Sequence, residues 1–213
     1  FMIAPRVNAA SRMGDPKDAF LLFTTDDETR ANELAKDLEK ANRSRRAQAA
    51  ATTRAVHDRL EERKIAGSIP DVIVMGDPNW RPGLLGLVAN SVAEEYERPV
   101  FLWGREGGST LKGSCRAGVP HISVVALMEI ATDAFEGFGG HRASGGFSVK
   151  EDMSFAREEK LCEAFSKLPK REGDAIAECA DGELKTTDAT NEVLNRLLRL
   201  APFGMGNEKP LFV

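Results

Sequence analysis

The spacing of apolar residues sets residues 26–66 apart from the rest of the chain. No glycine or proline interrupts this stretch, and its apolar positions are sparse. The pattern predicts one helix of about 60 Å, with Thr25 or Asp26 as its cap and Glu28 completing a capping box. Such a helix is largely solvated and bridges two domains. We interpret its arginines as a solvated face; they are Arg43, Arg45, Arg46, Arg54, Arg59 and Arg63.

From Pro70 to Leu168, short β-branched runs alternate with segments of helical periodicity. This alternation predicts an α/β fold, a mixed sheet with helices packed on it. The expected strands are residues 71–75, 99–103, 110–116 and 147–149. The expected helices are residues 82–96, 123–135 (with Ser123 as its cap) and 154–168.

The two ends of the chain have a different character. Residues 15–23 are expected to form a short helix, with Asp15 as its cap and Pro16 at the first helical position. After Pro169 we expect a strand at 174–179, a turn at 181–182 and a helix at 187–200. Phe1 is not an initiator methionine, and Val213 falls within an apparent strand. We therefore expect the sequence to be cut from a longer protein.

Composition narrows the class of protein. With 213 residues, 42% of them hydrophobic, the chain can build a globular core. No apolar run approaches the roughly 20 residues of a membrane span, and no secretory leader is visible. The three cysteines lack CxxC spacing, so we expect a cytoplasmic protein without disulfides or zinc. The net charge of −4 means that any binding of nucleic acid depends on local clusters.

Three segments carry candidate chemistry. In FGGHRASGG (138–146), glycines allow close approach of a ligand and His141 can contact a phosphate. In KGSCRAG (112–118), Lys112, Ser114 and Arg116 project from one face of the expected strand, as in a phosphate clamp. In GDPNWRPGLLGLVA (76–89), a helix start could attract an anion. Each also fits a structural role: a glycine-rich turn, an exposed strand, and tight packing of helix on sheet.

A metal-dependent hydrolase needs three or more convergent carboxylate or imidazole ligands. The three histidines, His57, His121 and His141, do not lie beside acidic clusters with ligand spacing. A GxSxG elbow is also absent. The sequence therefore predicts no metal site of its own.

Six segments, in order, resemble the RecJ branch of the DHH phosphoesterase superfamily. They span nearly the whole chain and are IAPRVNAASRMGD (3–15), LLFTTDD (21–27), the strand–WRPGLLGLVA unit (71–89), KGSCR (112–116), FGGH (138–141) and LAPFGMGNEKPLF (200–212). The chain departs from the family pattern at Arg81, where many relatives have histidine, and at Ser11 and Cys115, which replace common small residues, often glycine.

This resemblance implies a domain plan and a function. Residues 1–25 would end a DHH domain, 26–66 form the connecting helix, 67–168 form the DHH-associated substrate-binding domain, and 169–213 begin an OB-fold. The function implied is binding of single-stranded DNA for a 5′-to-3′ exonuclease of recombination and repair. Mn²⁺ or Mg²⁺ would be held by a DHH domain absent from this chain. The partners implied are single-strand-binding protein and a helicase.

The resemblance also implies site residues. Ser114 and Arg116 match a 5′-phosphate pocket, and His141 matches a histidine near the scissile phosphate. Further candidates for binding substrate are Arg6, Asn8, Arg12, Arg81, Lys112, Gly139 and Gly140. Two other functions stay open: a phosphodiesterase for short oligonucleotides or cyclic dinucleotides, and a non-catalytic RecJ-like scaffold. An intact upstream DHH motif would favour the enzyme over the scaffold.

Overall fold

A computed structural model describes residues 2–105, 110–149, 156–168, 180–204 and 206–213. The chain divides into two compact units, Phe1–Lys170 and Arg171–Val213. The first unit contains a five-stranded mixed sheet, and the second is a small unit built around one helix. The predicted α/β class is confirmed.

The sheet has the strand order β1-β2-β3-β5-β4. The strands β1 and β2 are parallel, and every other neighbouring pair is antiparallel. Their bounds are β1 Ile73–Gly76, β2 Val100–Arg105, β3 Leu111–Arg116, β4 Gly137–His141 and β5 Ser144–Val149. The predicted strands lie at β1, β2, β3 and β5, but β4 is an addition. The segment 138–146, for which a glycine-rich turn was the structural alternative, forms a hairpin of β4 and β5.

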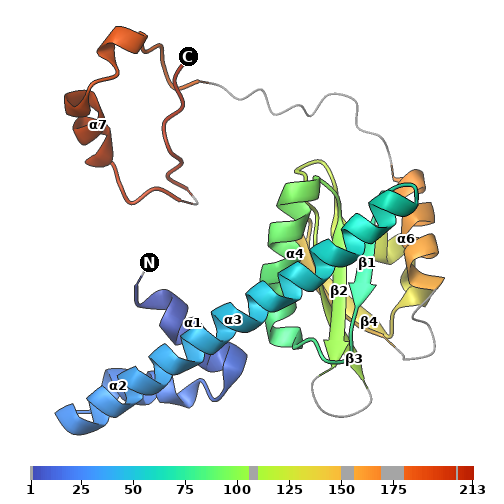
Figure 1. The fold of residues 1–213 in the computed structure, drawn as a ribbon, viewed down its shortest axis with the longest axis horizontal. Helices are drawn as coiled ribbons and strands as arrows, with labels where there is room; N and C mark the ends of the chain where they lie inside the picture. The colour runs from blue at the N-terminus through green and yellow to red at the C-terminus, as the bar shows by residue number, and fades with distance from the viewer. Residues whose placement is uncertain (1, 106–109, 150–155, 169–179, 205) are drawn as a thin grey trace. The chain divides into compact units, whose positions relative to one another are not determined.

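Helices cover both faces of the sheet (Figure 1). On one face lies α4 (Pro82–Tyr96), whose bounds match the prediction. On the other face lie α5 (Val124–Ile130), the short 3-10 helix η1 (Thr132–Ala134) and α6 (Ala156–Lys167). Two apolar cores result. One lies where α4 and the long helix cover β1 and β2, and the other lies on the opposite face, where α5 and α6 cover β1, β2, β3 and β5.

The long helix α3 runs from Glu28 to Ala66, 39 residues. Its cap is Asp27, whose carboxylate accepts hydrogen bonds from the N–H groups of Thr29 (2.8 Å) and Arg30 (3.2 Å). The predicted cap was one or two residues early, and the predicted capping box does not form. Thr25 instead accepts from the N–H of Asp27 at 3.2 Å and shapes the turn before the helix.

The two ends of α3 pack against different elements (Figure 1). Leu34 and Leu38 are buried near α1 (Ala4–Met13) and α2 (Lys17–Thr24). Val56 and Leu60 are buried in the core formed with α4 and the sheet. These four apolar side chains are thus all buried, and the helix bridges two packed regions.

Other helix termini differ slightly from their predictions. The helix expected from residue 15 begins at Lys17, and Asp15 accepts a hydrogen bond from the N–H of Lys17 (2.9 Å). Ser123 caps α5 as predicted, accepting from the N–H of Ala126 (3.2 Å). However, α5 ends at Ile130, and the expected continuation forms η1 instead.

The second unit holds η3 (Thr186–Asp188) and α7 (Asn191–Leu198), which Thr190 caps. The predicted helix at 187–200 is therefore shorter at both ends. In place of the predicted turn, Gly182 forms a parallel bridge with Phe212. The strand expected at 174–179 lies outside the described residues. Among the described helices, none is both long and apolar enough to cross a membrane.

Candidate functional site

On the face of the sheet that α4 packs against, the side chains of β2 are apolar, whereas those of β3, β5 and β4 are mostly polar or glycine. Directly opposite residues of antiparallel strands share a face, so the register defines rows across the sheet. One row is Val100, Arg116, Ser144 and His141. The next is Leu102, Ser114, Gly146 and Gly139. The β2 members are buried in the core beneath α4, whereas the β5 and β4 members lie beyond it.

We call this polar surface the ledge. It consists of Lys112, Ser114, Arg116, Gly139, His141, Ser144 and Gly146. Five of these seven residues are among the candidates taken from the sequence, although they come from segments up to 29 positions apart. Their common face follows from the two-residue period of the three strands.

The floor of the ledge lacks side chains. A Cβ placed on Gly139 would have no atom within 4 Å, and one on Gly146 would meet only the carbonyl oxygen of Gly113, at 3.7 Å. Glycine therefore leaves the backbone open to a ligand in this row. Gly140 is different: its φ is +151°, and a Cβ would lie 2.4 Å from the carbonyl oxygen of Ser144. Gly140 is required by the hairpin, and a contact with ligand there stays a prediction.

Ser114 and Arg116 approach α4 at the same point. A Cβ on Gly86 would lie 2.9 Å from Nη2 of Arg116 and 3.6 Å from Oγ of Ser114. Nη1 of Arg116 donates to the carbonyl oxygen of Cys115 at 2.7 Å, which leaves Nη2 and Nε for a ligand. Gly86 thus provides space for the two side chains, and one small anion could contact both.

The thiol of Cys115 lies on the opposite face of β3, in the core with α5. Burial raises its pKa to about 12, an effect that the nearby charge of Arg116 only partly offsets. It is therefore a neutral, apolar side chain near neutral pH and contributes packing.

Arg12 and Arg81 lie where α1 meets the start of α4. Nη1 of Arg12 donates to the carbonyl oxygen of Gly83 at 2.8 Å, and Arg81 approaches Met13. A Cβ on Gly83 would lie 3.2 Å from the backbone oxygen of Arg12, so this glycine serves close packing. Gly83 and Gly86 are three residues apart on α4 and share one side of the helix. The contact between α1 and α4 at Gly83 therefore lies next to the Arg116 guanidinium at Gly86.

Arg45 of α3 belongs to the same neighbourhood, although its pattern in the sequence predicted only a solvated helix face. Burial lowers its pKa, and the positive charges of Arg12 and Arg46 lower it further. Nη2 and Nε of Arg45 donate to Oδ1 of the buried Asn42 at 3.0 and 3.3 Å. In the described part of the chain, neither Arg12 nor Arg45 pairs with a carboxylate. Two adjacent guanidinium groups without a counter-charge favour binding of an anion.

A signal for Arg45 was present in the sequence. Leu34, Leu38 and Asn42 follow one another at intervals of four, so they lie on the same buried side of α3. An apolar residue is expected at the third position, but asparagine occupies it. A polar side chain in a buried stripe needs hydrogen-bond partners. Arg45, three residues later on the same side of the helix, supplies one.

Two other predicted residues, Arg6 and Asn8 of α1, do not lie on the ledge. Nε of Arg6 forms an ion pair with Glu39 at 2.5 Å, and that arginine lowers the pKa of the Glu39 carboxyl. Arg6 also lines an apolar cavity of about 280 Å³ with Val7 and Leu38. Asn8 is exposed on α1. Lys112 is on the ledge face but exposed, one row beyond Ser114.

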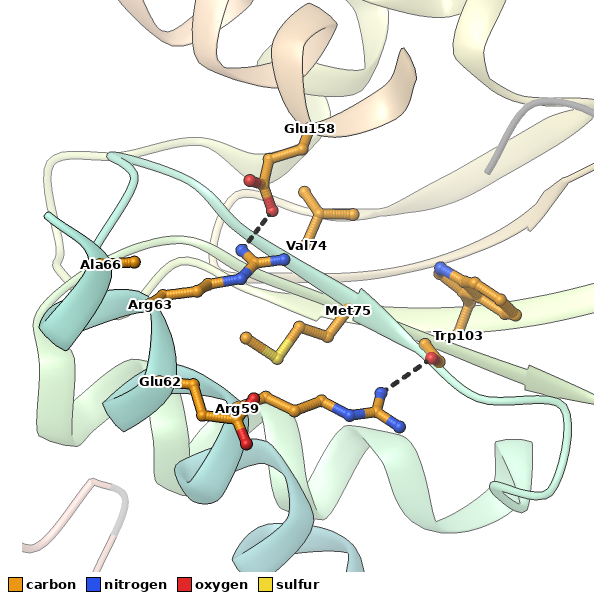
Figure 2. A pocket seen from close by; sticks show the side chains of 9 residues that line it. Arg59, Glu62, Arg63, Ala66, Val74, Met75, Trp103 and Glu158 are labelled. Atoms are coloured by element: carbon orange, nitrogen blue, oxygen red, sulfur yellow. Dashed lines mark hydrogen bonds and ion pairs between the residues drawn. The ribbon is translucent and has the colours of Figure 1, made fainter. Parts of the chain in front are cut away.

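A cavity of about 710 Å³ lies at the opposite edge of the sheet, between β1, α3 and α6 (Figure 2). Its arginines are already paired. Arg63 bonds Glu158 at 2.6 Å, and Arg59 bonds Asp77 at 2.9 Å and the carbonyl oxygen of Gly76 at 3.0 Å. These contacts fasten α3 to the sheet and α6, so we assign the cavity a structural role.

The side chains that the structure describes do not support binding of a metal ion. Within the described residues, no group of three or more histidine, cysteine, aspartate or glutamate side chains could hold a metal ion. The ledge offers one imidazole with hydroxyl and guanidinium groups, which suit an anion and not a divalent cation.

Comparisons with known proteins give consistent matches. Residues 70–171 match the DHHA1 domain model, and residues 180–213 match the RecJ OB domain model. The whole chain is 33% identical to the single-stranded-DNA-specific exonuclease RecJ of Thermus thermophilus, covering 30% of that protein. It is 28% identical to RecJ of Escherichia coli, covering 37%. The chain thus spans about a third of the length of the curated relatives it matches.

Solved structures agree with the sequence matches. The crystal structure of RecJ from Thermus thermophilus in complex with Mg²⁺ superposes on the whole chain with a TM-score of 0.80 and 31% identity, covering 32% of that structure. A crystal structure of exonuclease RecJ bound to manganese covers 82% of this chain and 43% of its own, with a TM-score of 0.70 and 32% identity.

Proposed function

The chain belongs to the RecJ family, and on that basis we propose that it is the substrate-binding portion of a metal-dependent 5′-to-3′ single-stranded-DNA exonuclease. The reaction would be hydrolysis of phosphodiester bonds during DNA recombination and repair in the cytoplasm. The observation that carries this proposal is the ledge, where Ser114, Arg116 and His141 lie in register on one open face.

The ledge supports binding of a 5′-phosphate. Arg116 offers a guanidinium with free N–H groups, and Ser114 offers a hydroxyl beside it. A terminal phosphate carries more negative charge than an internal phosphodiester, and such a donor pair responds to that difference. His141 is exposed in the same row as Arg116, where it can contact the next phosphate.

Arg12 and Arg45 would contact the following backbone. Their positive charges are uncompensated within the described residues and adjoin the Arg116 group through Gly83 and Gly86 of α4. Such contacts are typical of sequence-independent binding, in which phosphates supply the affinity. Arg81, at the same junction, would assist.

The metal would be held elsewhere. Solved RecJ structures contain Mg²⁺ or Mn²⁺, whereas no cluster of donors among the described residues of this chain fits a divalent ion. We therefore assign hydrolysis to a DHH domain outside this chain, with binding left to the residues above. The 213-residue chain alone would not hydrolyse DNA with or without manganese. Single-strand-binding protein and a helicase are proposed partners of the whole protein.

The match of residues 180–213 to the RecJ OB domain favours the exonuclease over a phosphodiesterase for oligonucleotides or cyclic dinucleotides. A non-catalytic scaffold would keep the binding residues and lack the metal ligands upstream. The reading frame before Phe1 distinguishes the scaffold from the enzyme.

The test compares Arg116→Ala with the unmodified chain on 5′-phosphorylated and 5′-hydroxyl single strands, by fluorescence anisotropy. A hydrogen bond to a charged group is worth roughly 1.5–3 kcal/mol, so affinity for the phosphorylated strand should fall about ten- to a hundredfold. The hydroxyl strand should be affected less. Arg54→Ala, an exposed arginine of α3, is the control. Equal losses on both strands would overturn the assignment of the 5′-phosphate pocket.

A further inference from the structure

Ser144 occupies the middle of the row that joins Arg116 to His141. It is the first residue of β5 and pairs with Arg116 on one side and His141 on the other. The three side chains therefore emerge from the same face of the sheet, with Ser144 between Arg116 and His141 in the row.

The pairing brings Ser144 close to Arg116. In an antiparallel ladder, hydrogen-bonded pairs alternate with non-hydrogen-bonded pairs, whose Cα atoms lie about 4.5 Å apart. The N–H of Ala117 donates to the carbonyl oxygen of Ala143 at 3.0 Å, so the adjacent Arg116–Ser144 pair is of the closer kind. Next to it, Gly146 and Gly139 leave the floor of the ledge open.

The hydroxyl of Ser144 is available to a ligand. It makes no hydrogen bond within the described residues, and its side chain is only partly exposed. Ser148 provides a comparison on the same strand and the same face. Its Oγ donates to the carbonyl oxygen of Gly137 at 3.4 Å, so that hydroxyl is used within the hairpin.

We propose that Ser144 is a third donor to the terminal 5′-phosphate and sets selectivity for it. This inference rests on the proposed function of the ledge. A terminal phosphate has three non-bridging oxygens, whereas an internal phosphodiester has two. Ser114 and Arg116 engage two oxygens from the α4 side, and Ser144 engages the remaining one from the β5 side. The third donor therefore acts only when a terminal phosphate is bound.

The experiment measures the Kd of the 213-residue chain for 5′-phosphorylated and 5′-hydroxyl oligothymidylate. Ser144→Ala should weaken binding of the phosphorylated strand about tenfold, as expected for a hydrogen bond to a charged group, and leave the hydroxyl strand unchanged. Ser148→Ala is the matched control and should change neither. Ser144→Thr keeps the hydroxyl and should retain most of the affinity, which separates loss of the donor from damage to the hairpin.

Three outcomes overturn the inference. If Ser144→Ala binds both strands like the unmodified chain while Arg116→Ala loses the phosphorylated strand, Ser144 is not a donor and the proposed function stands. If Ser144→Ala loses equally on both strands, or Ser144→Thr fails to rescue, the hydroxyl does not read the terminal group. If the unmodified chain shows no preference for a 5′-phosphate and Arg116→Ala has no effect, the proposed function fails first.

Discussion

The guanidinium of Arg116 occupies the space that a side chain at Gly86 would take. A Cβ on Gly86 would come within 2.9 Å of Nη2 of Arg116, closer than real Cβ contacts allow. The absence of a side chain on α4 therefore fixes where the main cationic group of the ledge can lie. The sequence suggested that the glycines of this helix serve packing, which holds for Gly83 but describes Gly86 only in part.

Gly86→Ala should separate binding from stability. The added methyl meets the far end of a flexible side chain, so Arg116 can move aside and the fold should persist. Alanine is favoured over glycine within a helix by up to about 1 kcal/mol, so the melting temperature should be unchanged or slightly higher. Affinity for 5′-phosphorylated single strands should fall severalfold because Arg116 is displaced from Ser114.

The measurements are anisotropy titration and thermal unfolding. Asn90→Ala, at an exposed position of the same helix, controls for the change in helix propensity. Full affinity in a folded Gly86→Ala chain would mean that the position of Arg116 beside α4 does not matter for binding.

The sequence predicted best where periodicity is strong. The bounds of α4 were predicted correctly because its apolar residues repeat at helical spacing from Leu84 to Tyr96 and Pro82 marks its start. The length of α3 followed from the lack of glycine and proline. The exact cap did not, since three consecutive residues, Thr25 to Asp27, can all accept from a helix N-terminus.

The strand β4 could not be predicted from its own residues. GFGGH contains no β-branched side chain and three glycines, a composition that strands avoid. Pairing with β5 imposes the extended conformation, and this is a tertiary effect. Arg45 was missed for a related reason: its neighbours Arg12 and Arg46 include one from another helix, which only the packing of α1 on α3 brings near.

Asp77 should make the stability of the fold sensitive to acid. The N–H of Asn79 is the main cause that holds the pKa of Asp77 below its usual value of 3.8, with a further contribution from Arg59. A lowered pKa in the folded state means that this contribution is present above pH 3.8 and is lost as pH falls through the folded-state value. The melting temperature should therefore decline below about pH 4.

Asp77→Asn removes the charge that Arg59 of α3 contacts at 2.9 Å. The melting temperature should be lower at pH 7, and its decline between pH 5 and 3 should be shallower than in the unmodified chain. Asp58→Asn, at an exposed position of α3, should leave both unchanged. An acid decline in Asp77→Asn as steep as in the unmodified chain would assign acid sensitivity to other carboxylates.

Arg45 should contribute to binding at some cost to the fold. Burial and the charges of Arg12 and Arg46 lower its pKa, which means that the folded state disfavours its positive charge. An arginine kept in such a place favours an anionic ligand that compensates it. Arg45→Gln retains an amide donor for Asn42 and removes the charge, so the melting temperature should stay the same or rise.

The affinity of Arg45→Gln for single-stranded DNA should fall, and by the same factor whether or not the 5′ end is phosphorylated. Each phosphate neutralised on a single strand contributes about 0.7 to the slope of log affinity against log salt. Arg45→Gln should reduce that slope by about this amount and weaken 5′-phosphorylated and 5′-hydroxyl strands equally. Arg54→Gln, on the same helix but exposed and without a partner among the described residues, should leave the slope unchanged. A slope that stays the same in Arg45→Gln, or falls equally in both variants, would remove Arg45 from the binding surface and return it to the solvated helix face inferred from the sequence.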